Sequence, residues 1–226
     1  MTAAVNLPGA DNPAVISFAQ RTLQTIRALP DVQAAGVTTL IPFSGDINYN
    51  VILAEGHVMR PGESLTAPST VTVSPGYFEA IGARLVAGRA FDDRDTATSP
   101  KVVVIDDRLA RQFWNGQEAV GRRLYRPSDP KDVTKITKDT EFYNVVGVIK
   151  EMQLMDPRGD YTPVGVAYFP LDQNPSRGMR RPVVPDFSGW NWVPNTRPRS
   201  TAAANGAPCV VTAAAAAAGA ANEWVK

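Results

Sequence analysis

His57 is the only histidine of the 226-residue chain, and histidine is the side chain best suited to acid–base chemistry near neutral pH. A serine nucleophile would need this imidazole beside it, together with a carboxylate that orients the ring. The segment around it, from Glu55 to Pro68, is polar, and no G-x-S-x-G sequence occurs in the chain. We therefore predict that His57 is a solvated loop residue, that no residue is catalytic, and that the chain is not an enzyme.

Three aspartates, Asp92, Asp93 and Asp95, are spaced closely enough to offer oxygen ligands to a divalent cation. A calcium loop would need the D-x-D-x-D-G spacing with a distant glutamate, and this pattern is absent. We interpret the three residues as a solvated turn, in which Asp95 or Thr96 caps the following segment. The sequence therefore predicts no metal site and no cofactor.

Asp106 and Asp107 are a second pair of carboxylates that could do acid–base work. The pair directly precedes a segment of helical apolar spacing that runs to Trp114. A carboxylate at the start of a helix accepts hydrogen bonds from free backbone N–H groups and is stabilised by the helix dipole. We predict that these residues cap a helix.

Four arginines lie close in sequence to two aromatic residues, which are Trp114 and Tyr125; the arginines are Arg108, Arg111, Arg122 and Arg123. Basic groups interleaved with aromatic rings can bind single-stranded nucleic acid. Acidic neighbours, among them Asp106, Asp107 and Glu118, would neutralise much of this charge. We predict a solvated face with scattered ion pairs and no nucleic-acid partner.

Phe113 and Trp114 are adjacent aromatic residues at the end of the same predicted helix. Neighbouring helical residues cannot both face one core, because they point about 100° apart. One ring is expected to pack inside, and the other to lie at an edge or at a protein interface.

The composition is that of an ordinary globular domain, with 44% hydrophobic residues, 20% charged residues and a net charge of +1. The single cysteine, Cys209, excludes an intrachain disulfide. No apolar run is long enough to predict a transmembrane helix, and Met1–Ala10 lacks the features of a signal peptide. Neither a Walker A motif nor G-x-G-x-x-G occurs, so any ATP hydrolysis must belong to another chain or domain.

The elements expected to position these residues follow from periodicity and turn signals. Ser74 and Pro75 predict the start of a short helix that carries Tyr77 and Phe78. The other predicted helices are Ala14–Leu29 and the segment after Asp107; the predicted strands are Val32–Leu40, Asn48–Ala54, Thr70–Val73, Lys101–Ile105, Phe142–Ile149 and Val164–Phe169. Core positions are predicted at Phe18, Tyr77, Phe78, Phe91, Phe113 and Val146.

A set of short motifs occurs in a characteristic order: Ser74-Pro75-Gly76-Tyr77-Phe78, Gly82, Gly88-Arg89-Ala90-Phe91, Ala110–Trp114, Gly121–Leu124 and Val145–Ile149. In this combination the chain, from about Val5 to Gln173, resembles the MacB-like periplasmic core domain of FtsX-like ABC transporter permeases. The resemblance is to the bacterial permeases that carry two such domains. No single motif would be specific enough, but their combination is.

The resemblance implies an α+β fold of mixed sheets with helices on one face. It implies one domain over residues 5–175, divided into a porter-like subdomain (5–55 and 142–175) and a second subdomain inserted into it (about 56–141). Family members continue with a strand and an amphipathic helix. The segment Ser176–Lys226 is instead rich in proline, arginine and alanine, so we expect a disordered, low-complexity tail, in which the run Ala213–Ala218 forms at most a frayed helical turn.

The resemblance also implies a non-enzymatic function in transport or efflux. The domain would lie on the periplasmic face of the bacterial inner membrane and transmit ATP-driven movement of transmembrane helices to a substrate or partner outside the membrane. Its partners would be the permease's transmembrane segments, an ATP-binding subunit and a periplasmic adaptor protein. Since the chain itself shows no membrane segment, we expect a fragment of a longer permease. The alternative is a free-standing soluble module that binds a ligand or a protein.

Overall fold

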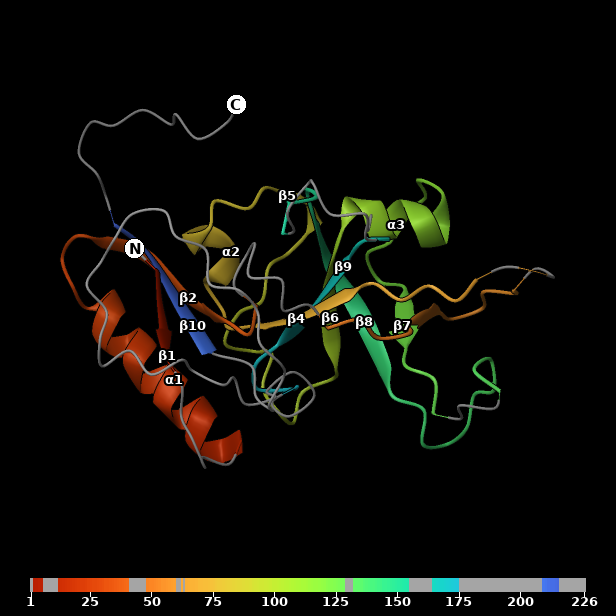
Figure 1. Cartoon of the computed structure of the whole chain (residues 1–226), viewed down its shortest axis with the longest axis horizontal. Coiled ribbons are helices and arrows are strands. Elements are labelled where there is room, and N and C mark those ends of the chain that lie inside the picture. The colour runs from red at the N-terminus through yellow and green to blue at the C-terminus, as the bar shows by residue number, and fades with distance from the viewer. Residues whose placement is uncertain are drawn as a thin grey trace, which may run out of the picture.

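The computed structural model describes residues 2–5, 12–40, 48–59, 62, 64–128, 132–154, 164–174 and 209–215. The elements in chain order are β1 (Thr2–Val5), α1 (Asn12–Arg27), β2 (Val32–Thr38), β3 (Leu53–Ala54), β4 (Ser69–Val73), α2 (Tyr77–Ala80), β5 (Leu85–Gly88), β6 (Val102–Asp106), α3 (Asp107–Trp114), β7 (Arg123–Tyr125), β8 (Phe142–Ile149), β9 (Val166–Pro170) and β10 (Cys209–Ala215). Within these ranges all the strands join one sheet, shown in Figure 1.

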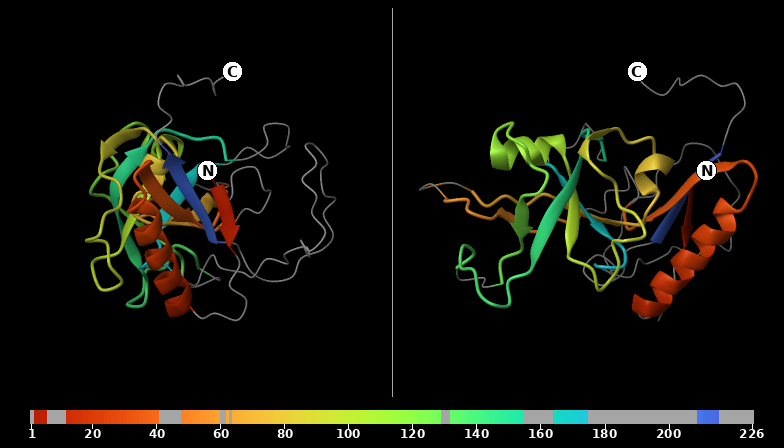
Figure 2. Two further views of the ribbon diagram at one scale, coloured as in Figure 1. Left: turned by 90° about the vertical axis from the view of Figure 1, so that its left-hand side faces the viewer. Right: turned by 180° about the vertical axis from the view of Figure 1, so that it is seen from behind.

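The strand order is β1-β10-β2-β4-β9-β6-β8-β7-β3, and β5 pairs with β8 beside this path. The pairs β4–β9 and β6–β8 are parallel and the remaining pairs are antiparallel. Figures 1 and 2 show α1, β1, β10 and β2 gathered at one end of the molecule, with α3 toward the other end. A mixed sheet with few helices confirms the predicted α+β class.

Both faces of the sheet are apolar at its centre. Successive strand residues point to opposite sides, and consecutive residues of β6 are apolar. In β6, Val103 and Ile105 pack with α3 in one buried cluster, whereas Val102 and Val104 pack with α2 in another. Of the predicted core positions, Tyr77, Phe78 and Phe91 are buried, and Phe18, Phe113 and Val146 are half-buried.

The helices cover both faces of the sheet, which corrects the expectation that they lie on one. Ala35 and Val37 of β2 pack with α1, whereas a side chain at Gly36 would meet the backbone of Tyr77 in α2 at 2.3 Å. Helices α1 and α2 therefore lie on opposite sides of β2, as Figures 1 and 2 also show. The reason is that α2 buries Tyr77 and Phe78 against the second apolar face of β4 and β6, which α1 does not cover.

Helix α2 begins later than predicted, and Ser74 is not its cap. The N-cap is Gly76, with φ 80°, a left-handed conformation that glycine adopts without a Cβ clash. The Ser74 hydroxyl instead accepts the N–H of Val37 at 2.8 Å and donates to the carbonyl of Pro75 at 3.1 Å. The Ser74 side chain therefore joins β2 to the end of β4 and does not cap a helix. A local Ser-Pro motif cannot reveal this, because Val37 is distant in sequence.

Two strand predictions also change. Of the predicted strand Asn48–Ala54, only Leu53–Ala54 is a strand, because it pairs with β7 while Tyr49 makes an isolated bridge to Ser69. Strand β5 was not predicted; it pairs with β8 through Leu85, Ala87 and Gly88. The Val164–Phe169 strand occurs as Val166–Pro170.

The expected disorder of Ser176–Lys226 is wrong for residues 209–215, which form β10 between β1 and β2. Ala213–Ala215 are part of this strand, so the alanine run does not begin as a helical turn. Val210, Val211 and Thr212 favour extended structure, and pairing on both sides satisfies their backbone groups. The rest of the tail lies outside the described residues.

The predicted division into a porter-like and an inserted subdomain stays a prediction. Strands assigned to the two parts alternate within one sheet, where β8 lies between β6 and β7, and β9 between β4 and β6.

Candidate functional site

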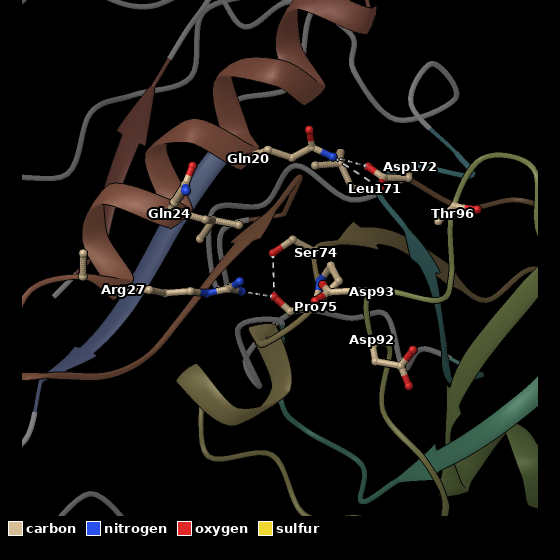
Figure 3. Close-up of a pocket in the computed structure, with 12 residues that line it drawn as sticks. Gln20, Gln24, Arg27, Ser74, Pro75, Asp92, Asp93, Thr96, Leu171 and Asp172 are labelled. Atoms are coloured by element: carbon tan, nitrogen blue, oxygen red, sulfur yellow. Dashed lines mark hydrogen bonds between the residues drawn. The ribbon is translucent and has the colours of Figure 1, made fainter.

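A cavity of about 680 Å³ separates α1 from the central part of the sheet (Figure 3). This volume lies within the usual range of small-molecule sites. The lining comes from α1, from the end of β4, from the loop between β5 and β6 and from the end of β9: Gln20, Leu23, Gln24, Arg27, Ala28, Ser74, Pro75, Asp92, Asp93, Thr96, Leu171 and Asp172. Segments far apart in sequence therefore meet around it.

Arg27, the last residue of α1, ties the helix to two backbone segments. Its Nη2 donates to the carbonyl of Ala35 at 2.9 Å and to that of Pro75 at 2.5 Å, and its Nε donates to Ala35 at 3.3 Å. Figure 3 shows the side chain extending from α1 toward Pro75. Sequence reasoning missed Arg27, because its role depends on acceptors that only the fold brings together.

Asp172 follows β9 on the opposite wall of the cavity. Gln20 of α1 donates from Nε2 to its two carboxylate oxygens at 3.4 Å each. The pKa of Asp172 is raised above its ordinary value, mainly because the carboxyl is partly buried. The Gln20 hydrogen bond acts to lower this pKa, and the nearby charge of Asp93 acts to raise it. The lining thus offers hydrogen-bond donors, acceptors and negative charge, together with the apolar side chains of Leu23 and Leu171. This combination suits the binding of a ligand better than covalent chemistry.

The three aspartates at 92–95 form a turn, as predicted, but Asp95 is buried and not solvated. Arg89 makes a two-pronged ion pair with Asp95, at 2.7 and 2.8 Å, and Asp95 also accepts the N–H of Asp92 at 3.0 Å. Asp92 is paired with Arg94 at 2.7 Å. The carboxylates of Asp92 and Asp95 therefore meet guanidinium and backbone donors, and the described residues hold no group of three or more potential ligands that could bind a metal ion.

Asp106 is the N-cap of α3, as predicted, and it also joins this helix to β9. Its two oxygens accept the N–H of Leu109 at 2.8 Å and the N–H of Val166 at 3.0 Å. The residue is 1% exposed. Burial raises its pKa to about 6, against the two backbone hydrogen bonds and with a further contribution from the charges of Glu151 and Asp107.

Asp107 lies in an ion network with the segment that follows β8. It accepts hydrogen bonds from Lys150 at 2.7 Å, from Arg111 at 2.8 Å and from the N–H of Glu151 at 2.8 Å. Partial burial acts to raise the pKa of Asp107, but these hydrogen bonds together lower it to about 2. The two neighbouring carboxylates thus have separate structural partners and do not share a proton site.

The predicted arginine cluster divides among separate contacts. Arg108 pairs with Glu151 at 2.7 Å, and Arg123 pairs with Glu55. Arg122 lies over the Trp114 ring at 5.7 Å and donates to the carbonyl of Glu118 at 2.7 Å. This confirms a face of scattered ion pairs.

His57 lies at a second cavity, of about 440 Å³, between the end of β3 and the end of α3. Its ring is half-buried and meets the ring of Phe113 edge-on, with centroids 6.5 Å apart. One ring of the adjacent pair is buried and the other lies at the cavity edge, as predicted, but the buried ring is Trp114 and not the predicted core residue Phe113. His57 is thus a half-buried loop residue at the edge of this cavity, and its lack of a catalytic role stays a prediction.

Comparison with known proteins gives a consistent family signal. The family model described as MacB-like periplasmic core domain matches residues 4–204. No curated protein sequence matches the chain. The match extends past Gln173, where the resemblance in sequence motifs ends, and so includes part of the proline-rich segment.

Among solved structures, the periplasmic region of MacB from Actinobacillus actinomycetemcomitans is similar with a TM-score of 0.50 at 12% identity, over 89% of this chain and 66% of that one. The extracellular domain of the ABC-type transporter YknZ from Gram-positive bacteria is similar with a TM-score of 0.48 at 12% identity, over 96% of this chain and 85% of that one. At such identity the first likeness concerns the fold. Among the described residues, no helix combines the length and the apolar character needed to cross a bilayer.

Proposed function

Because the chain belongs to the MacB-like periplasmic core domain family of ABC transporter permeases, we propose that it transmits ATP-driven movement of membrane-spanning helices to a substrate or partner outside the membrane. The ATP-binding subunit and the membrane segments would belong to other regions or chains. A periplasmic adaptor protein is a further proposed partner. The domain itself would act mechanically and carry out no chemistry.

The observation that carries this proposal is the pairing of β1 with β10. The two strands are antiparallel neighbours, with Thr2 opposite Thr212 and Val5 opposite Cys209. The chain therefore enters β1 and leaves β10 at the same end of the sheet. Segments attached to both strands would pull on one site, as a domain held between two membrane helices requires.

The sheet is suited to carrying such a displacement. Apolar clusters cover both faces of its central strands, and Val103, Val104 and Ile105 are fully buried. Closely packed interiors move as units and do not deform continuously. A shift that passes from β1 and β10 to the central strands would therefore move these strands together as one rigid body.

The pairing of β1 and β10 also permits a direct test. Within the permease that contains this domain, residues 2–215 would be replaced by a short Gly/Ser linker, because the two ends lie on neighbouring strands. The readouts are ATP hydrolysis and the survival of cells exposed to compounds against which the intact permease protects. We expect hydrolysis to remain and protection to be lost; unchanged protection would contradict the proposal.

The 680 Å³ cavity favours a second candidate function, a soluble module that binds a small ligand. In that case a ligand would raise the melting temperature of the isolated chain. A thermal-shift screen of amines and amphiphilic compounds tests this, with Asp172→Asn as the variant expected to weaken any shift. The absence of a shift would leave the mechanical function as the account of the chain.

A further inference from the structure

The strand pairing within the sheet is shortest between β2 and β4. Strand β2 pairs with β10 from Val32 to Thr38, but its ladder with β4 contains the single pair Thr38–Val73. We call β1, α1, β2 and β10 the terminal unit, and the remaining strands with α2 and α3 the central unit. The chain enters and leaves through the terminal unit, so a pull there acts across this junction.

Beyond the pair Thr38–Val73 the strand pairing ends, and we call this point, where Gly36 still packs against the backbone of Tyr77, the fork. The next step, Val37 and Ser74, is held by the Ser74 N–H to the Val37 carbonyl at 2.9 Å and by the Val37 N–H to the Ser74 hydroxyl at 2.8 Å. One step further, the carbonyls of Ala35 and Pro75 both accept from Nη2 of Arg27. The guanidinium thus bridges the fork where strand pairing has ended.

The two acceptors of Arg27 belong to different units. Arg27 and Ala35 are both in the terminal unit, so their contact is kept when that unit moves. Pro75 is in the central unit, just before α2, so its contact must break if the fork opens. We propose that Arg27 is a latch whose hydrogen bond to Pro75 holds the terminal unit in the position seen here and is released when the fork opens.

The polar contacts across the cavity are sparse, whereas apolar packing joins the two units through Leu171 against α1 and β2 and through Gly36 against the Tyr77 backbone. The 680 Å³ cavity lies between α1 and the central unit, and the Gln20–Asp172 hydrogen bonds across it are 3.4 Å long. Asp92 and Asp93 line the same cavity, and since Asp92 is already paired with Arg94, a released guanidinium would find a nearby acceptor chiefly in Asp93. A structural element that switches between two positions needs favourable contacts in each of them. For Arg27 these would be the Pro75 carbonyl in one position and an acidic residue of the cavity in the other. The use of this latch in transport rests on the proposed function, whereas the latch itself does not.

Spin-label distance measurements on the whole chain test the latch. Labels would be placed at two exposed positions, Ser17→Cys on α1 and Ala97→Cys in the central unit, with Cys209→Ala. With Arg27 present we expect one narrow distance distribution. Arg27→Ala should broaden it or add a second, longer distance.

The matched control is Arg21→Ala on the same helix, since Arg21 is exposed and its Nε donates only within α1, to Ser17 at 3.3 Å. This control should leave the narrow distribution unchanged. If Arg27→Ala gives the same distribution as Arg21→Ala, the latch is wrong. Should Arg27→Ala fail to melt cooperatively, Arg27→Met decides, because methionine keeps an apolar side chain and has no N–H donor: broadening supports the latch, and an unchanged width overturns it. Neither result depends on transport, so failure of the latch is distinguishable from failure of the proposed function.

Discussion

Replacing Asp106 by asparagine should remove a pH dependence of stability between pH 4 and 7. Burial raises the pKa of this carboxyl from its ordinary 3.8 to about 6 in the folded chain. The folded state therefore binds the proton more tightly, so stability falls as pH rises from about 4 to 6. A difference of about two pKa units corresponds to roughly 3 kcal/mol. Asparagine cannot ionise and keeps one acceptor oxygen for the N–H of Leu109 or Val166.

Urea unfolding followed by circular dichroism at pH 4, 5, 6 and 7 measures this effect. Between pH 4 and 7 we expect Asp106→Asn to gain about 2 to 3 kcal/mol of unfolding free energy relative to wild type. Asp31→Asn, at an exposed position, is the control and should follow the wild type. Parallel curves for wild type and Asp106→Asn across this range would refute the reasoning.

Three further predictions concern single contacts. Asp107→Asn should reduce the unfolding free energy by roughly 1 kcal/mol at pH 7; because its folded pKa is lowered to about 2, this loss should vanish as pH falls from about 4 to 2 in urea titrations. Gly36→Ala should lower stability by about 3 kcal/mol or more, since the new methyl group would lie 2.3 Å from the Tyr77 backbone; an unchanged melting temperature would contradict this packing. Tyr168→Phe should be neutral or stabilise by about 1 kcal/mol, because the buried Tyr168 hydroxyl has no hydrogen-bond partner among the described residues; a clear loss in chemical denaturation would mean that a partner exists.

Local signals predicted those features that depend on neighbours in sequence. Asp106 before a helical apolar pattern predicted the cap of α3, since capping involves an N–H three residues away. The short helix with Tyr77 and Phe78 was predicted together with their burial. Closely spaced aspartates at 92–95 indicated a turn, whereas the ion pairs of Arg89 with Asp95 and of Arg94 with Asp92 were not predicted.

Features that depend on distant pairing were missed or misread. Strand β10 was taken for disordered tail because its alanines dilute the β-branched signal of Val210, Val211 and Thr212, and its partners are about 170 to 210 residues away in sequence. The serine cap at residue 74 failed for the same reason, since Val37 supplies a competing partner. The cavity between α1 and the sheet has no sequence motif, because four separate segments line it.

The most direct test of the central claim is a distance measured in a membrane permease that carries this domain, as the proposed function requires. A spin label at position 97 and a second label in a flanking membrane-spanning segment would be compared with and without a non-hydrolysable ATP analogue in proteoliposomes. The account predicts a nucleotide-dependent change in this distance, while a pair of labels within the central unit, at Ala97 and Glu79, keeps its distance. A membrane-to-domain distance that is the same in both nucleotide states, in a permease that hydrolyses ATP, would contradict the account.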